Sequence, residues 1–120
     1  RELDYKKYDE MFYHTMAEDT EETAAELALN RLRFPAELSE KNKTVYEAYI
    51  QEHMETVAID LVKREDIEGI RFLEQKKLWS EAALQTGMDV AAEEKKTESL
   101  SVLMDVRKEL FPKKKKTFEL

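Results

Sequence analysis

Apolar residues recur at every third or fourth position along almost the whole chain. This spacing places them on one side of an α-helix, and no stretch shows the strict alternation of a half-buried strand. The pattern therefore predicts an all-α fold. In the first predicted helix, residues 4–16, the apolar stripe comprises Tyr5, Tyr8, Phe12 and Met16, with Tyr13 beside it. We expect this stripe to enter the core; the alternative is an aromatic ridge that docks a partner.

The second predicted helix has recognisable signals at both ends. Asp19 and Glu22 have the spacing of a capping box, in which side chains satisfy the free amide groups at a helix start. Pro35 disfavours helical geometry in the residue before it, so the helix should end near Phe34. Its apolar face is predicted to carry Ala24, Ala25, Ala28, Leu29 and Leu32.

A third helix is predicted to begin at Thr44. Thr44 and Glu47 form a second capping box, and the polar run 39–43 before it is typical of a connection. The apolar residues that follow together are Val45, Tyr46, Tyr49 and Ile50. At the far end, residues 52–54 form a candidate connector that contains His53.

A repeat of thirty residues appears in the second half of the chain. Segments 67–73 and 97–103 match in character, and each follows a charged connector, 64–66 or 94–96, which an apolar helical segment precedes. The repeated unit is therefore helix, tight turn, helix. A single pair of short helices is marginal in water, so neighbouring pairs should stack to cover their apolar sides. We expect the two terminal units to present a polar outer face.

Residues 86–92 and 97–104 resemble an ankyrin repeat, whose first helix opens with Thr-Pro-Leu-His-x-Ala and whose second helix carries leucines. Thr86 and Ala91 match that motif and Met88 stands for its leucine, whereas two positions depart from it, Gly87 and Asp89. The resemblance implies an array of stacked helix-turn-helix pairs. Neither unit carries the Gly-Ala-Asp hairpin that projects from ordinary ankyrin repeats, so their usual binding finger is not expected here.

The preceding unit, residues 50–77, resembles the repeat less, because Asp60 falls where an apolar residue belongs. Three further segments are similar to a C-terminal module of uncharacterised bacterial proteins: 33–35, 61–66 and 111–120. That second resemblance implies an ankyrin-like helical stack without an assigned chemistry.

Composition limits the classes of function that remain. The chain has 120 residues, 42% of them hydrophobic, so we expect one domain, 1–112. Because it has no cysteine, we expect neither thiol chemistry nor a zinc finger, and we expect a cytoplasmic location. No window is apolar enough to span a bilayer. Residues 1–60 hold 7 Lys and Arg against 15 Asp and Glu. Without the tail from residue 113 onward, the body of the chain holds 16 Lys and Arg against 26 Asp and Glu. This acidic body repels nucleic acid and anionic lipid, so neither is an expected partner.

Residues 113–120 form a basic tail that begins with four lysines. We expect a mobile, solvated end. The alternative is that the tail folds back onto the acidic N-terminal half and places Phe118 and Leu120 in a groove.

The sequence predicts no catalytic, metal-binding or cofactor site. Only two histidines are present, and while Glu10 precedes His14 by one helical turn, His53 has no carboxylate at that spacing. The simpler interpretation is that the two histidines have no functional role and face solvent or a turn. The alternative is a small helical enzyme or regulator with an acidic pocket around Glu10 and His14.

The favoured function is a non-catalytic protein-protein interaction or scaffold module that uses a helical repeat surface. Trp79 lies in the link between two helix pairs, before the candidate cap Ser80. It is expected to seal the seam between stacked units; alternatively it anchors a partner, because tryptophan is enriched among residues that dominate interface energies. The candidate partner contacts are Trp79, Tyr46 and Tyr49, and the expected partner is a protein.

Overall fold

The computed structural model of the chain describes residues 5–17 and 21–112. Within these ranges every regular element is a helix, which confirms the predicted all-α class. The seven helices in the described part are α1 (Tyr5–Ala17), α2 (Glu21–Arg33), α3 (Glu40–Glu52), α4 (Met54–Arg64), α5 (Ile67–Gln75), α6 (Glu81–Glu93) and α7 (Thr97–Leu110). None of these helices has the length and apolar character needed to cross a lipid bilayer.

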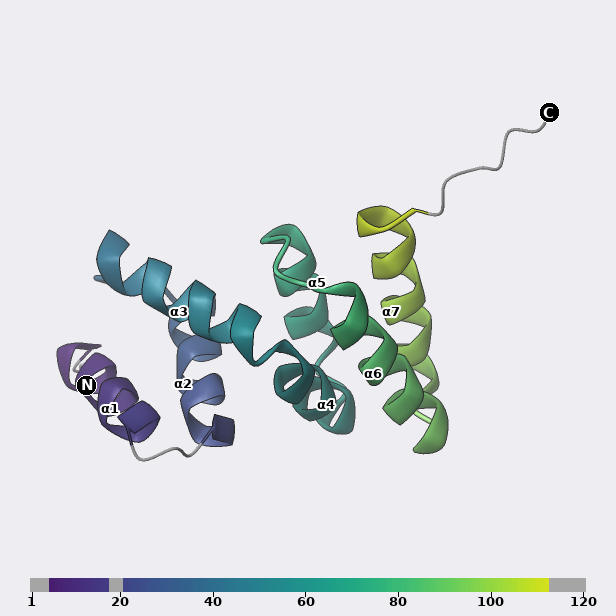
Figure 1. Cartoon of the computed structure of the whole chain (residues 1–120), viewed down its shortest axis with the longest axis horizontal. Coiled ribbons are helices and arrows are strands. Elements are labelled where there is room, and N and C mark those ends of the chain that lie inside the picture. The colour runs from purple at the N-terminus through teal and green to yellow at the C-terminus, as the bar shows by residue number, and fades with distance from the viewer. Residues whose placement is uncertain (1–4, 18–20, 113–120) are drawn as a thin grey trace.

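The chain runs along the long axis of the molecule, from α1 at one end, past α2 and α3 and then α4 and α5, to α6 and α7 at the other end (Figure 1). Its extents are 59 × 30 × 28 Å, and its radius of gyration of 16.1 Å exceeds the roughly 13.5 Å expected for a compact domain of this length. The principal packing contacts join helices that are one or two places apart in the chain. The fold is therefore an elongated array in which each helix packs mainly against its near neighbours.

Helices α4 to α7 form two pairs that pack side by side. The first helices of the pairs, α4 and α6, are in extensive contact, and the second helices, α5 and α7, also meet. The N-terminal helices join this array through the contact between α2 and α4. The buried residues of all these interfaces form one continuous apolar core.

The turns inside the two pairs have the same backbone structure. Glu65 and Lys95 both adopt the left-handed conformation, with φ of 51° and 59°. In the first turn the amide of Asp66 donates to the Leu61 carbonyl at 2.9 Å, and in the second the amide of Lys96 donates to the Ala91 carbonyl at 2.8 Å. These contacts close a helix C-terminus in the Schellman manner. The predicted thirty-residue unit of helix, tight turn and helix is thus confirmed.

The ends of α1 and α2 lie near the predicted positions. Helix α1 begins at Tyr5, and α2 ends at Arg33, where the amide of Phe34 closes the last turn by donating to the Asn30 carbonyl at 3.0 Å. The Asp19 and Glu22 capping box and the side chain of Met16 lie outside the described residues.

The predicted start of the third helix is wrong by four residues. Helix α3 begins at Glu40, because the Ser39 side chain accepts a hydrogen bond from the Asn42 amide at 3.1 Å and so caps the helix. The polar run 39–43 therefore forms the cap and first turn rather than a connection. Its polar side chains are tolerated there because this end of the helix is largely exposed.

His53 is the single residue between α3 and α4, which agrees with the predicted connector. Its amide donates to the Tyr49 and Ile50 carbonyls that end α3, and its carbonyl accepts from Val57 in the first turn of α4. The basic tail, 113–120, lies outside the described residues.

Candidate functional site

The three predicted partner contacts have their side chains in the core. Tyr46, Tyr49 and Trp79 are 1%, 8% and 4% exposed. Phe12 packs edge-on against both tyrosines, with ring centroids 4.7 and 5.4 Å apart. Trp79 Nε1 donates to the Ile70 carbonyl at 3.1 Å, as expected of a residue that seals the link before α6. A partner that docks on the folded chain would reach little of these side chains.

Asp9 and Arg31 form a buried ion pair between α1 and α2. Arg31 Nε lies 2.8 Å from Asp9 Oδ1, and Arg31 also donates to the Phe34 carbonyl at 3.0 Å. From α3 the Tyr46 hydroxyl donates to Asp9, and the Asn42 amide group reaches Asp9 Oδ2 at 3.4 Å. We call these four side chains, Asp9, Arg31, Asn42 and Tyr46, the Asp9 cluster. It ties the first three helices together.

The Asp9 cluster holds its protons firmly. Burial raises the pKa of Tyr46, and the hydrogen bond to Asp9 and its negative charge raise it further. Burial by itself lowers the pKa of Arg31, but the hydrogen bond and the charge of Asp9 outweigh that effect and raise it. Neither group can exchange a proton near neutral pH. The cluster is therefore suited to fixing helices and not to acid-base catalysis.

Sequence analysis missed the Asp9 cluster, although the helical pattern contains a signal for it. Asp9 falls one turn after Tyr5 and one turn before Phe12, on the apolar stripe of α1. Arg31 falls one turn after Ala28 on the apolar face of α2. Two opposite charges on the apolar faces of successive helices indicate a buried pair, since an unpaired buried charge is strongly unfavourable.

Glu10 and His14, the residues of the alternative acidic pocket, are both exposed on α1. The acidic side chain that α1 buries is the neighbouring Asp9. Across the described ranges, no three His, Asp or Glu side chains come together in a way that could hold a metal ion.

A second ion pair joins the two halves of the array. Arg33, at the end of α2, donates to Asp66 Oδ2 at 2.7 Å, and Asp66 caps α5 by accepting from the Gly69 amide at 2.9 Å. Burial by itself raises the pKa of Asp66, but the hydrogen bonds from Arg33 and Gly69 and the positive charge of Arg33 lower it overall. The carboxylate is thus fixed in its charged form between two elements.

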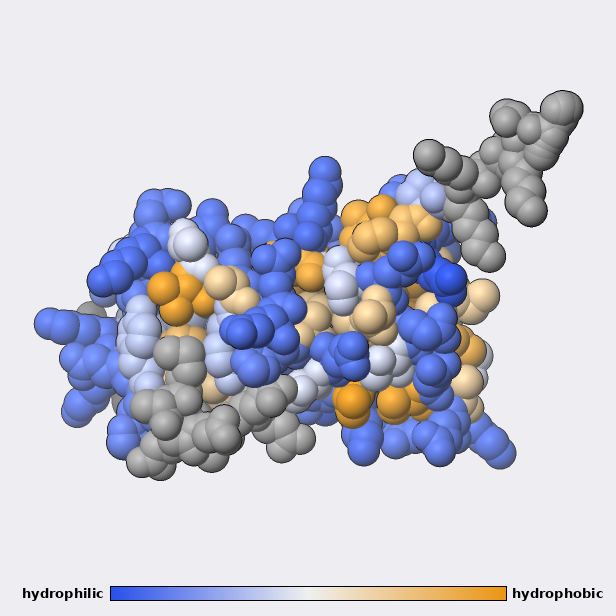
Figure 2. Space-filling model, in the orientation of Figure 1, coloured by the Kyte–Doolittle hydropathy of each residue, from blue (hydrophilic) through white to orange (hydrophobic). Residues whose placement is uncertain are grey.

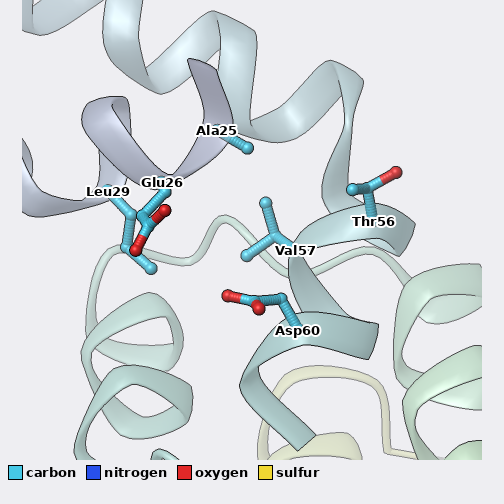
Figure 3. A pocket seen from close by; sticks show the side chains of 6 residues that line it. All are labelled: Ala25, Glu26, Leu29, Thr56, Val57 and Asp60. Atoms are coloured by element: carbon cyan, nitrogen blue, oxygen red, sulfur yellow. The ribbon is translucent and has the colours of Figure 1, made fainter. Parts of the chain in front are cut away.

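A small pocket lies between α2 and α4 (Figure 3). Its volume is about 10 Å³, which is at the lower limit for one water molecule. Glu26 from α2 and Asp60 from α4 line it, and Asp60 is already paired with Arg64 at 2.8 Å. The pocket is too small for a ligand.

A shallow polar depression of about 300 Å³ surrounds the junction of α3 and α4. Its lining includes His53 and the neighbouring Glu52 and Glu55, together with Ser80 from the start of α6. The His53 ring packs against the Tyr49 ring at a tilt of 37°, with centroids 4.2 Å apart, which makes it part of the packing at this junction.

An apolar groove of about 850 Å³ lies on the outer side of α7. We call it the α7 groove; it is lined by Met88, Thr97, Leu100, Ser101, Met104, Asp105, Arg107, Lys108, Phe111 and Pro112. Met104 is 56% exposed. Orange and tan surface is visible at this end of the molecule in Figure 2. The outer face of α7 is thus polar only in part, because Leu100, Met104 and Phe111 line it beside polar and charged residues.

Comparison with known families, curated proteins and solved structures gives no significant match to this chain. Its function must therefore be inferred from its own residues. The α7 groove has a large volume and an apolar lining, and it is open to solvent, so it is the candidate functional site.

Proposed function

We propose that this chain is a non-catalytic protein-interaction or scaffold module, built as an ankyrin-like stack of helix pairs and acting in the cytoplasm. The contacts of α4 with α6 and of α5 with α7 support the stack, as do the matching left-handed turns at Glu65 and Lys95. The cysteine-free sequence supports a reducing compartment.

The α7 groove is the observation that carries the proposal. Soluble proteins leave large apolar side chains exposed in a cluster chiefly where they bind something. Met104 is more than half exposed, and Leu100 and Phe111 are partly exposed beside it. A recognition surface needs such a patch, whereas an active site needs convergent polar groups with shifted pKa values. The Asp9 cluster and Asp66, whose pKa values are shifted, lie away from this groove. Arg71, whose pKa is raised chiefly by its hydrogen bond to Glu74, meets the groove through its ion pair with Asp105 and forms no convergent polar site there.

The test is chemical cross-linking of the tagged full chain to its neighbours in cells, followed by mass spectrometry. The wild-type chain is compared with Met104→Glu, which places a charge in the α7 groove. Met11→Glu on α1 is the matched control, because Met11 is 54% exposed and undergoes the same change in charge.

A discrete set of cross-linked proteins that is lost with Met104→Glu and kept with Met11→Glu supports the proposal. Circular dichroism and thermal melting of both variants check that the fold is retained. If the wild-type chain and the two variants give the same cross-linked proteins, or none, recognition through this surface is refuted.

A further inference from the structure

The α7 groove continues an interface that the fold already contains. The inner side of α7 packs on α5 and α6, as α6 in turn packs on α4. Within the described ranges no helix covers the outer side of α7, where Met104 is exposed. A further helix laid against this side would extend the packing that joins the earlier helices.

The apolar residues of the groove have the spacing of a helix-binding seam. Leu100 and Met104 are four residues apart and lie on one side of α7, and Phe111, the residue that follows the end of α7, lines the same groove. From Leu100 to the end of α7 at Leu110 the helix is about 15 Å long, which corresponds to roughly three turns of a partner helix. The flexible side chains of Met88 and Met104 can adapt to the residues of such a helix.

The charges along the groove favour an acidic occupant. Arg107 and Lys108 both line it, and Arg107 is engaged only weakly, with the neutral Gln85 Oε1 at 3.4 Å. Lys108 has no ion-pair partner in the described part of the chain. The one carboxylate of the lining, Asp105, lies 3.4 Å from Arg71 and is already paired. The groove thus offers a positive edge on a protein whose net charge is −7.

We infer that the α7 groove binds an amphipathic helix of another protein, with apolar residues spaced three or four apart and Asp or Glu beside them. This inference rests on the proposed recognition function and names the class of partner. A second copy of this chain fits less well, because its own exposed apolar face, the α7 groove, carries the same positive charges at Arg107 and Lys108 and would repel this one. Apolar anchors would give the affinity, and the charges at Arg107 and Lys108 would select the partner.

The probes are two labelled synthetic helical peptides of about 18 residues, with leucines spaced three and four apart. One peptide has glutamates beside the leucines and the other has lysines at the same positions. Binding to the full chain is measured by fluorescence anisotropy at low salt. We expect the glutamate peptide to bind at least about tenfold more tightly than the lysine peptide, although the acidic body of the protein favours the opposite order.

Three variants locate the contact. Met104→Glu should weaken binding of the glutamate peptide by about tenfold or more, because it places an unpaired charge in the seam. Lys108→Glu should weaken binding of the same peptide by about threefold to tenfold and should strengthen binding of the lysine peptide. Met11→Glu should change neither. In methyl NMR spectra the Met104 and Met88 signals should shift on binding while the Met11 signal stays in place.

The inference is overturned if neither peptide binds, or if the lysine peptide is preferred and Met104→Glu has no effect. It is also overturned if a chain that ends at residue 112 shows altered Met104 and Met88 signals without peptide, since the tail would then be the occupant. Self-association that Met104→Glu abolishes in sedimentation would assign the groove to a second copy. If the peptides fail while Met104→Glu still loses cross-linked proteins in cells, the recognition function stands and the helix class is wrong.

Discussion

Ser99 occupies in α7 the position that Gly69 occupies in α5, thirty residues earlier and third from the helix start in both cases. Both residues are buried, and Gly69 faces Leu61 of α4. A Cβ atom at Gly69 would lie 2.9 Å from Leu61 Cδ2 and 3.0 Å from the Asp66 carboxyl carbon. The first pair of helices therefore has no space for a side chain at residue 69, whereas the second pair accepts one at the equivalent residue 99.

We predict that Ser99→Ala stabilises the protein. Ser99 Oγ is fully buried without a hydrogen-bond partner among the described residues, so the hydroxyl loses its hydration and gains nothing in return. Alanine removes that penalty and has a higher helix propensity. The free energy of unfolding in urea should rise by about 1 kcal/mol. A decrease would show that the hydroxyl has a partner in solution.

The equivalent change in the first pair, Gly69→Ala, should have the opposite sign. The gain in helix propensity is offset by the crowding against Leu61, which is itself fully buried, and against the Asp66 carboxyl group that caps α5. We expect a net loss of about 1 kcal/mol in the same urea experiment. Equal effects of Gly69→Ala and Ser99→Ala would contradict the difference between the two pairs.

Glycine should stabilise the two turns in which Glu65 and Lys95 adopt positive φ. Side chains with a Cβ atom are strained in this conformation, and glycine is not. Glu65→Gly and Lys95→Gly should each raise the free energy of unfolding by about 0.5–1 kcal/mol, after allowing for the greater freedom of glycine in the unfolded chain. The control is Ala92→Gly, an exposed helical position three residues before Lys95, which should lower it by about 1 kcal/mol. Calorimetry of the three variants measures both signs.

Asp9→Asn should weaken the attachment of α1. The change leaves the buried guanidinium of Arg31 without its counter-charge, at a cost of about 3 kcal/mol. Glu10→Gln is the matched control, since it removes the same charge from the exposed neighbouring position and should change stability by less than about 0.5 kcal/mol. Hydrogen exchange should report faster exchange in α1 and α2 for Asp9→Asn and unchanged exchange in α7. Equal effects of the two variants would show that Asp9 is not the residue that holds α1.

Asp66 should make the joint between the two halves sensitive to acid. Its pKa is lower in the folded chain than its ordinary value of 3.8, so the charged form contributes stability above that pH and the contribution is lost as the pH falls through the folded pKa. Asp66→Asn keeps an N-cap acceptor and should cost about 1 kcal/mol at pH 7 through loss of the Arg33 pair. Asp66→Ala loses the cap too and should cost about 1 kcal/mol more.

The measurement is urea unfolding of wild type and Asp66→Asn at pH 7 and at a pH well below 3.8. The difference between the two proteins should shrink at the lower pH, because protonation removes the charge that Asp66→Asn also removes. A difference that stays constant with pH would mean that the Arg33 pair contributes nothing.

The sequence predicted the local structure of this chain better than its surface. The charged connectors at 64–66 and 94–96 were recognisable because the apolar pattern stops there and resumes in a new register. The start of α3 was missed because Thr44 and Glu47 have the spacing of a capping box, and the pattern alone cannot show that Ser39 closes on the Asn42 amide.

The candidate site could not be predicted for a different reason. Leu100, Met104 and Phe111 have the same helical spacing as core residues, and nothing in that spacing tells whether another helix covers them. Trp79 was ambiguous in the same way, and its indole is directed inward by the Ile70 carbonyl, a contact that only the folded chain creates.

Because the helices meet mainly their neighbours in the chain, a force that pulls the two ends apart would pass through the interfaces in series. The array would then lengthen in steps, and the weakest junction would open first. One such junction lies between the N-terminal segment, α1 to α3, and the C-terminal segment, α4 to α7. The contact of α2 with α4 and the ion pair of Arg33 with Asp66 hold it together. Under tension the C-terminal segment, with the α7 groove, could remain intact after the N-terminal helices have separated from it.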